Sequence, residues 1–239
     1  FPEKSPAEIE AILSGVWDNL GRIAAEFAQL DRLTIAGPDL TAPADIACAP
    51  ETLERLKALR EGGKPALVFA AHLANWEAPA RAAAAIGVEA GILFRPPNIR
   101  SVAEAVERVR DMNMGTLIAS GPDAPFRLAA LLDRGAHVGM LVDQHYDRGV
   151  EVEFFGRRCK ANPTLARLAR HFDAPIYGLR AIRTDRHRFI VELSEPIAAL
   201  RDAQGGVDVQ ATMQAITSVV ERWVREHPDQ WLWLHRRWR

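Results

Sequence analysis

The spacing of hydrophobic residues near the start of the chain is that of a long helix. Residues 5–33 begin with a Ser-Pro pair, which is typical of a helix start because Pro loses no hydrogen bond in the first turn. Apolar residues then recur at helical intervals, at Ile9, Ile12, Leu13, Val16, Leu20 and Ile23. We expect an amphipathic helix here, then a loop rich in Pro and Ala to about Cys48, and then a short helix over residues 51–60.

The pattern changes after about residue 64, where apolar stretches of strand length alternate with helical segments. Several of these stretches are uninterrupted, as in strands that are buried on both faces of a sheet. The expected strands are residues 65–72, 88–95, 137–144, 150–156, 174–183 and 188–196, and the expected helices are 76–86, 99–112, 124–134, 162–172 and 208–227. This alternation predicts an α/β fold, with a mostly parallel or mixed central sheet flanked by helices.

The composition is that of one globular domain over residues 1–239. Its 48% hydrophobic and 26% charged residues are enough for a single sizeable core. A formal net charge of -1 argues against a nucleic-acid partner, because phosphate contacts demand a strong basic excess. Cys48 and Cys159 are too few for a disulfide framework and match no metal spacing, which favours a reducing compartment and leaves one bridge between them open.

No segment approaches the roughly 20 consecutive apolar residues that span a bilayer. The chain also opens without the basic and apolar regions of a signal peptide. Because its first residue is Phe1 rather than Met, we expect the native protein to start further upstream.

The stretch "AHLANWEAP", residues 71–79, places polar side chains where a predicted strand ends. Ligands of open α/β sheets gather at the carboxyl ends of strands, and His72 occupies such an end. Asn75 is a good helix cap and Pro79 fits only a first turn, so the next helix should begin at Asn75 or Trp76. Glu77 would then lie in that first turn.

A histidine on this turn can fold back toward the Glu77 carboxylate. Glu77 would be held ionised by the positive helix end and would orient one imidazole nitrogen of His72, leaving the other free to take a proton. The alternative is a structural His72 bonded to a backbone carbonyl, with Glu77 a simple charge at the helix start. A zincin site would need a second histidine, and no G-x-S-x-G is present, so we predict no metal and a nucleophile supplied by the substrate.

A second pair of polar residues, Asp143 and Gln144, ends the predicted strand "HVGMLVDQ" at the same expected edge. They are candidate substrate-binding residues, although Asp143 could equally cap the following loop. The run Asp143, His145 and Asp147 lacks a fourth ligand, which is poor support for a metal site.

The block "HLANWE" resembles the H-x-x-x-x-E motif of the bacterial lipid A biosynthesis acyltransferases, the late lauroyl and myristoyl transferases. These enzymes are related to glycerolipid acyltransferases, which use Asp in place of the Glu. Further blocks look like those of the family, in family order and over nearly the whole chain: "FPEKSPAEIEAIL", "FRPPNIR", "DQHYDRGVEVEFFG", "NPTLARLA", "APIYGLRAIR" and "HPDQWLWLHRRWR". Six ordered blocks are far more specific than one short motif.

The resemblance implies transfer of a fatty acyl group from acyl carrier protein, or from a coenzyme A thioester, to the hydroxyl of a 3-hydroxyacyl chain on a lipid A precursor. His72 would deprotonate that hydroxyl, and Glu77 would orient His72 and stabilise its cationic form. The acyl thioester is a co-substrate, and no cofactor is expected. The rivals are an acyltransferase of the same family that acts on another hydroxylated or glycosylated lipid, and a non-catalytic lipid-binding protein.

The resemblance also implies substrate-binding residues. Arg110 matches the family's arginine downstream of the His/Glu block and is expected to meet substrate phosphate or transition-state charge; the alternative is a solvated helix arginine. Arg95 and Asn98 in "FRPPN" match a block at another strand end and are expected to bind phosphate or the acceptor. Their alternative is a rigid Pro-Pro turn braced by Arg95.

The C-terminal residues bear on location. Trp231, Trp233 and Trp238 lie among arginines, a composition of membrane interfaces, although the alternation in "QWLWLH" also suits burial in the core. Family members carry a membrane helix just before the segment that matches "FPEKS". We therefore expect acyl carrier protein, a lipid A precursor and the membrane surface as partners, at the cytoplasmic face of the inner membrane.

Overall fold

The computed structural model describes residues 1–36, 44–185 and 188–238. The helices are α1 (Pro6–Phe27), α2 (Pro50–Glu61), α3 (Ala78–Ala85), α4 (Arg100–Asp111), α5 (Ala124–Asp133), α6 (Thr164–Phe172) and α7 (Val209–Glu226), with 3-10 turns η1 (Leu30–Arg32) and η2 (Pro228–Gln230). The strands are β1 (Ile46–Cys48), β2 (Leu67–Ala70), β3 (Ala90–Phe94), β4 (Thr116–Ala119), β5 (His137–Leu141), β6 (Val150–Phe154), β7 (Arg157–Ala161), β8 (Ile176–Arg183) and β9 (Phe189–Leu193).

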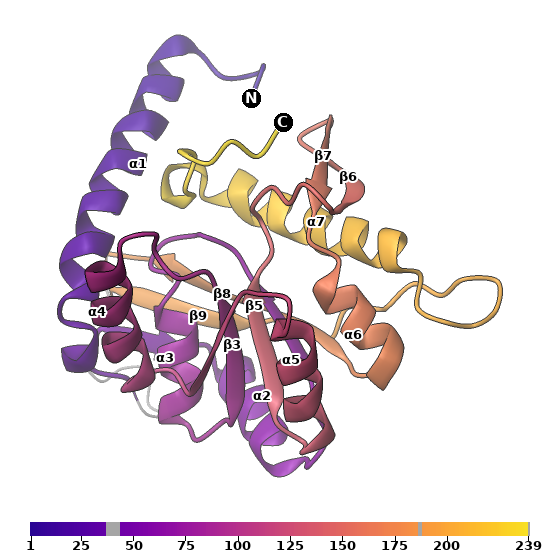
Figure 1. The fold of residues 1–239 in the computed structure, drawn as a ribbon. Helices are drawn as coiled ribbons and strands as arrows, with labels where there is room; N and C mark the ends of the chain where they lie inside the picture. The colour runs from indigo at the N-terminus through magenta and orange to yellow at the C-terminus, as the bar shows by residue number, and fades with distance from the viewer. Residues whose placement is uncertain (37–43, 186–187, 239) are drawn as a thin grey trace.

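The central sheet has seven strands in the order β1-β9-β8-β2-β5-β3-β4. All neighbours in it are parallel except β8 and β9, so the prediction of a mostly parallel or mixed sheet flanked by helices is confirmed. The remaining strands, β6 and β7, form a separate antiparallel hairpin. Figure 1 shows the helices around the sheet, with α1 running along one side of the molecule.

The N-terminal helix forms where its sequence predicts. The Ser5 side chain accepts a hydrogen bond from the Glu8 backbone N–H, and the Glu8 carboxylate bonds back to Ser5, which satisfies the open first turn. The helix ends at Phe27, earlier than expected. Two polar residues, Asn19 and Glu26, are buried on its inner face together with Val16 and Ile23.

The two faces of the sheet are filled differently. On one face Leu67 and Phe69 of β2 are completely buried in a core shared with α5, α6 and α7, where Phe69 stacks on Trp223. The alternate residues Val68 and Ala70 point to the other face and are only half-buried. They line a cavity between the sheet and helices α2 and α3.

Three strands were not predicted from the sequence. β1 and β4 are short strands at the two edges of the sheet, too brief to show a clear hydrophobic pattern. β7 carries three exposed basic residues, Arg157, Arg158 and Lys160. Part of the loop predicted before Cys48, residues 37–43, lies outside the described residues.

The C-terminal segment does not form a strand. Trp231 is almost fully buried against Phe154, which confirms the interpretation of Trp231 as a core residue, and Trp233 is partly buried. Backbone bonds tie the segment to the loop after β2: Ala74 donates to the Gln230 carbonyl, and Leu232 donates to the His72 carbonyl. The end of the chain thus packs against the loop that carries the predicted base.

Candidate active site

His72 lies two residues beyond the end of β2, and its carboxylate partner is Asp143. The imidazole Nδ1 is 2.8 Å from Asp143 Oδ1, and the His72 backbone N–H donates to Asp143 Oδ2 at 2.8 Å. The fold explains why His72 and Asp143 lie side by side: β2 and β5 are parallel neighbours, and Ala70 is aligned with Leu141. Residues that follow the carboxyl ends of neighbouring parallel strands emerge side by side.

Asp143 is fully enclosed, yet it remains a carboxylate. Its Oδ2 accepts a further hydrogen bond of 2.7 Å from the indole N–H of Trp231. Burial by itself would raise the pKa of Asp143, but the charge of His72 and the bonds from His72 and Trp231 outweigh it and lower the pKa to about 2. Asp143 is therefore ionised at any pH at which an enzyme of this kind works.

This pairing fixes the tautomer of the neutral imidazole. A carboxylate can only accept, so Nδ1 carries the proton and, in the neutral ring, Nε2 presents its lone pair. The side-chain amide nitrogen of Gln144 lies 3.3 Å from Nε2, where it can donate to that lone pair. The prediction that Glu77 orients His72 is wrong: the orienting carboxylate is Asp143, 71 residues further along the chain.

Glu77 instead pairs with Arg110. Arg110 donates to both carboxylate oxygens, through Nε at 3.1 Å and through a terminal nitrogen at 2.5 Å, and the Trp76 indole N–H adds a bond of 3.1 Å. The guanidinium also lies 5.9 Å from the ring centre of Phe27 and 5.7 Å from that of Phe94. Such a bidentate, aromatic-flanked arginine has one well-defined position.

The turn that carries these residues differs from the predicted one. Ala74 adopts a left-handed conformation (φ 47°), which is unfavourable for a residue other than glycine. The Asn75 side-chain oxygen then accepts the Glu77 backbone N–H at 3.1 Å. Helix α3 consequently begins at Ala78, with Glu77 as its cap residue, two or three positions later than expected.

A cavity of about 690 Å³ opens beside these groups. His72, Glu77, Arg95, Asn98, Arg110 and Gln144 all line it, so the structure brings the predicted site residues to one place, with Asp143 buried behind His72. Away from these polar groups the lining is apolar and includes Leu56, Leu59, Val88 and Leu193. The individual roles of Arg95, Asn98 and Gln144 stay predictions.

Three histidines that line the cavity were not predicted as site residues from the sequence. His137 lies at the apolar part of the cavity, where Nδ1 accepts the Ala66 N–H at 3.0 Å and Nε2 is 3.2 Å from the Leu59 carbonyl. Burial lowers the pKa of His137, with the Leu59 bond opposing it, so this histidine is a neutral wall residue. His145 and His235 also line the cavity.

Neither a metal site nor a membrane span is found in the part of the chain that the structure describes. Within it, no three His, Cys, Asp or Glu side chains are grouped so that they could hold a metal ion. None of its helices combines the length and apolar character needed to cross a bilayer. That the reaction needs no metal or cofactor stays a prediction.

Comparison with protein families identifies the chain. The family model described as bacterial lipid A biosynthesis acyltransferase matches residues 1–239, the whole chain. The chain belongs to this family. No curated protein matches the sequence. The family match shows that the protein is an acyltransferase of lipid A biosynthesis, which confirms the resemblance drawn from the sequence blocks.

The acyltransferase therefore has a site whose parts suit its class of reaction. One buried carboxylate holds an imidazole with a free lone pair, and a second holds a guanidinium in the wall of the same cavity. The first pair can move a proton, and the second can stabilise negative charge.

Proposed function

We propose that the acyltransferase moves a fatty acyl group from the thioester of acyl carrier protein to the hydroxyl of a 3-hydroxyacyl chain on a lipid A precursor, with His72 as the general base. The observation that carries this proposal is the His72–Asp143 pair at the wall of the cavity, with Nδ1 bonded and Nε2 left to accept a proton.

The steps balance without an enzyme-bound acyl group. The acceptor hydroxyl takes the place of Gln144 at Nε2 and gives its proton to His72 while its oxygen attacks the thioester carbonyl. The carbon–sulfur bond then breaks, and the departing thiolate takes the proton back from the imidazolium. Asp143 stays ionised throughout and stabilises the imidazolium while it exists.

The attack places negative charge on the thioester oxygen. Arg110 is the candidate for stabilising it, because Glu77 and two aromatic rings hold its guanidinium at the cavity wall. In this proposal Glu77 acts on Arg110 and not on His72. Arg95 and Asn98, which are exposed at the rim of the same cavity, are proposed to bind acceptor phosphate.

The apolar part of the cavity suits a fatty acyl chain. Its walls come from α2, through Leu56 and Leu59, and from strands of the sheet, through Val68 and Leu193. An apolar chain that enters this space leaves water without the loss of any hydrogen bond. We propose that this part of the cavity receives the acyl chain while the thioester carbonyl lies beside His72.

Several exposed apolar residues lie close in sequence to residues that line the cavity, such as Asn98, Ser120 and His235. Ile99 before α4, Phe126 at the start of α5 and Leu234 near the end of the chain are 65%, 77% and 54% exposed. Large exposed apolar groups near a lipid-binding cavity suit contact with a bilayer. We propose that the surface with these residues faces the membrane that holds the acceptor, at the cytoplasmic face of the inner membrane.

The test measures turnover by the purified protein. The donor is acyl carrier protein loaded with a labelled acyl chain, and the acceptor is a tetraacylated lipid A precursor. We expect His72→Ala to lower the rate by about 10³-fold or more, because both proton transfers are lost. The matched control is His171→Ala, an exposed histidine on α6 that does not line the cavity. It should keep wild-type turnover.

Other outcomes would change the proposal. Turnover with a coenzyme A thioester but not with the carrier protein would replace the donor. Turnover only with another hydroxylated or glycosylated lipid would replace the acceptor. Lipid binding without turnover by the wild-type protein, with either donor, would contradict the catalytic role of His72.

A further inference from the structure

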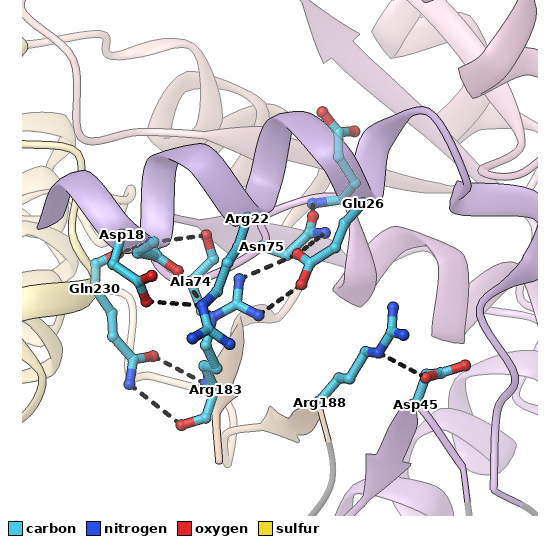
Figure 2. A network of polar contacts seen from close by, with 11 residues as sticks. Asp18, Arg22, Glu26, Asp45, Ala74, Asn75, Arg183, Arg188 and Gln230 are labelled. Carbon is cyan, nitrogen blue, oxygen red and sulfur yellow. Dashed lines mark hydrogen bonds and ion pairs between the residues drawn. The ribbon is translucent and has the colours of Figure 1, made fainter. Parts of the chain in front are cut away.

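A buried ion pair lies behind the loop that carries His72 and Glu77. Glu26 of α1 and Arg183 at the end of β8 form a bidentate pair, with contacts of 2.6 and 3.1 Å. Their side chains are 9% and 14% exposed. Figure 2 shows Arg183 between Glu26 on one side and Gln230 on the other. Gln230 bonds both the backbone N–H and the carbonyl of Arg183.

This network reaches the catalytic turn, which we define as residues 72–77. The Asn75 side-chain N–H donates to Glu26 Oε2 at 3.0 Å (Figure 2). Arg183 Nε donates to the Asn19 side-chain oxygen at 3.0 Å, and the Asn19 amide donates in turn to the carbonyls of Ala74, at 3.4 Å, and of Gln230, at 3.1 Å. Helix α1 and β8 therefore bind the catalytic turn from the side that faces away from the cavity.

The charge of Glu26 dictates how Asn75 is oriented. A carboxylate only accepts hydrogen bonds, so the amide nitrogen of Asn75 must face Glu26 and its oxygen must face the other way. That oxygen accepts the backbone N–H of Glu77, which sets where the Glu77 side chain begins. The left-handed residue, Ala74, is held in place by bonds on both its N–H and its carbonyl.

We propose that Glu26 and Arg183 are positioning residues, which hold the catalytic turn so that His72 and Glu77 keep their places at the cavity wall. A buried ion pair is weak support for stability, since apolar residues of similar volume stabilise a fold as well or better. The orientation of Asn75, in contrast, depends on a partner that accepts and cannot donate, which the Glu26 carboxylate supplies. This inference rests on the proposed function only for its kinetic test.

The first test compares Glu26→Gln with wild type in steady-state turnover. We expect kcat to fall about 10- to 100-fold, as for a catalytic group displaced by a fraction of an ångström to one ångström. KM for the acyl donor should change less than about 3-fold, and the shape of the pH–rate profile should stay the same, because neither titrating group of the His72–Asp143 pair is replaced. Arg183→Lys keeps the positive charge but not the bidentate geometry. Its kcat should therefore lie between those of Glu26→Gln and wild type.

The chain offers a matched control on the same strand. Arg180 of β8 is also 14% exposed; it pairs with the carboxylates of Glu192 and Glu226, where Arg183 pairs with that of Glu26. Each of the two arginines lies over an aromatic ring, Arg180 over Trp223 and Arg183 over Phe189. The partners of Arg180 lie outside the catalytic turn. Arg180→Gln should leave kcat at the wild-type value, with the melting temperatures of both variants as the control for stability.

The second test needs no substrate. The indole N–H of Trp76 bonds Glu77 Oε1, so its nuclear magnetic resonance signal reports the position of Glu77. The chain has six tryptophans, and Trp76→Phe assigns the signal. Glu26→Gln and Arg183→Lys should shift it, and Arg180→Gln should not.

The two tests separate this inference from the proposed function. Wild-type kcat in folded Glu26→Gln, or an unmoved Trp76 signal in it, overturns the positioning role. If Glu26→Gln does not fold, the same readouts on Arg183→Lys decide. If the wild-type protein itself shows no turnover, the proposed donor or acceptor is wrong, and the Trp76 signal still decides the positioning role.

Discussion

Two buried carboxylates stand at the cavity, and they differ in the partner that each holds. Asp143 and Glu77 have side chains that are 2% and 6% exposed, and each accepts a hydrogen bond from an indole N–H. Asp143 holds the imidazole of His72, and Glu77 holds the guanidinium of Arg110. An imidazole exchanges protons near neutral pH, whereas a guanidinium keeps its charge.

The difference assigns the two pairs to different steps. The Asp143–His72 pair can remove and return a proton, because its Nε2 is left with a lone pair. The Glu77–Arg110 pair presents a fixed positive group that cannot act as a base. Distance along the sequence is a poor guide to which carboxylate orients His72. Glu77 is five residues from His72, whereas the orienting residue, Asp143, is 71 residues away.

The largest effect that separates the two carboxylates is expected from Asp143→Asn. The amide oxygen would keep the bonds from the His72 backbone and from Trp231, so the amide NH₂ would face Nδ1. Nδ1 would then have to accept, and Nε2 would carry the proton and lose its role as a base. We expect kcat/KM to fall about 10³-fold, measured with the donor and acceptor of the proposed reaction.

Asp143→Asn should leave binding intact, because Asp143 lies behind His72. Binding of a non-hydrolysable acyl donor, measured by calorimetry, should change less than about 3-fold, as expected for a residue that supports proton transfer alone. A wild-type kcat/KM in this variant would mean that a group other than Asp143 orients His72.

The next largest effect is expected from Glu77→Gln. The neutral amide can no longer bond Arg110 through two acceptor oxygens, so the guanidinium loses its fixed position. We expect kcat to fall about 10²-fold, the amount typical for the loss of one aligned group that stabilises an oxyanion. The pH–rate profile decides the role: it should keep the wild-type shape, because the His72–Asp143 pair is unchanged.

Two further results bear on Glu77. Arg110→Lys should resemble Glu77→Gln, because a lysine keeps the charge without the bidentate bond. If Glu77→Gln instead displaces the pH–rate profile as Asp143→Asn does, Glu77 acts on His72 after all.

The sequence predicted the fold, and which residues meet at one cavity, better than how these residues pair with one another. Alternation of apolar runs and helical stretches located the helices from α3 to α7 to within a few residues, since local periodicity is enough for that. His72 and Gln144 follow strand ends, as expected, and Glu77 and Arg110 line the same cavity. Their hydrogen-bond partners depend on which strands are neighbours. The strand order β8-β2-β5-β3 cannot be predicted from any local sequence pattern.

The misassigned carboxylate has a local cause as well. The left-handed Ala74 and the Asn75 bond to the Glu77 N–H delay the start of α3, so Glu77 caps the helix rather than lying in its first turn. The conformation of Ala74 has no sequence signal, because alanine rarely adopts it, and Asn75 was expected to cap the helix itself. The hydrogen bond from Trp231 to Asp143 joins residues 88 positions apart, and no local sequence pattern predicts it.

A smaller effect is expected in the pH dependence of stability. The pKa of Asp143 is lowered from 3.8 to about 2 in the folded protein. A carboxyl group of this kind stabilises the fold above its unfolded pKa and loses that contribution as the pH falls through its folded pKa. We expect the folding advantage of wild type over Asp143→Asn to shrink by about 2 kcal/mol between pH 5 and pH 2, measured by urea unfolding.

His72→Ala is the control for that measurement. Among the groups that lower the pKa of Asp143, the charge of His72 contributes most. Its removal should raise the pKa of Asp143, so the loss of stability should begin at a higher pH than in wild type. An unchanged advantage of wild type over Asp143→Asn down to pH 2 would contradict the depressed pKa.

The smallest effects are expected from the two indoles. Trp231→Phe removes one of the donors to Asp143 and leaves a buried charged oxygen with one bond fewer, whereas Trp76→Phe removes a donor to Glu77, which keeps both bonds from Arg110. A hydrogen bond to a charged group contributes about 1.5 to 3 kcal/mol. Trp231→Phe should therefore lower kcat/KM about 10-fold, and Trp76→Phe about 3-fold or less.

The half-buried position of Trp76 is the reason for this order, because water can replace its N–H at Glu77, while no water reaches Asp143 behind Trp231. Kinetics of the two variants at one pH, with melting temperatures as the control for packing, measure the difference. The reverse order, with Trp76→Phe the more damaging, would mean that the Glu77–Arg110 pair limits the rate more than proton transfer by His72 does.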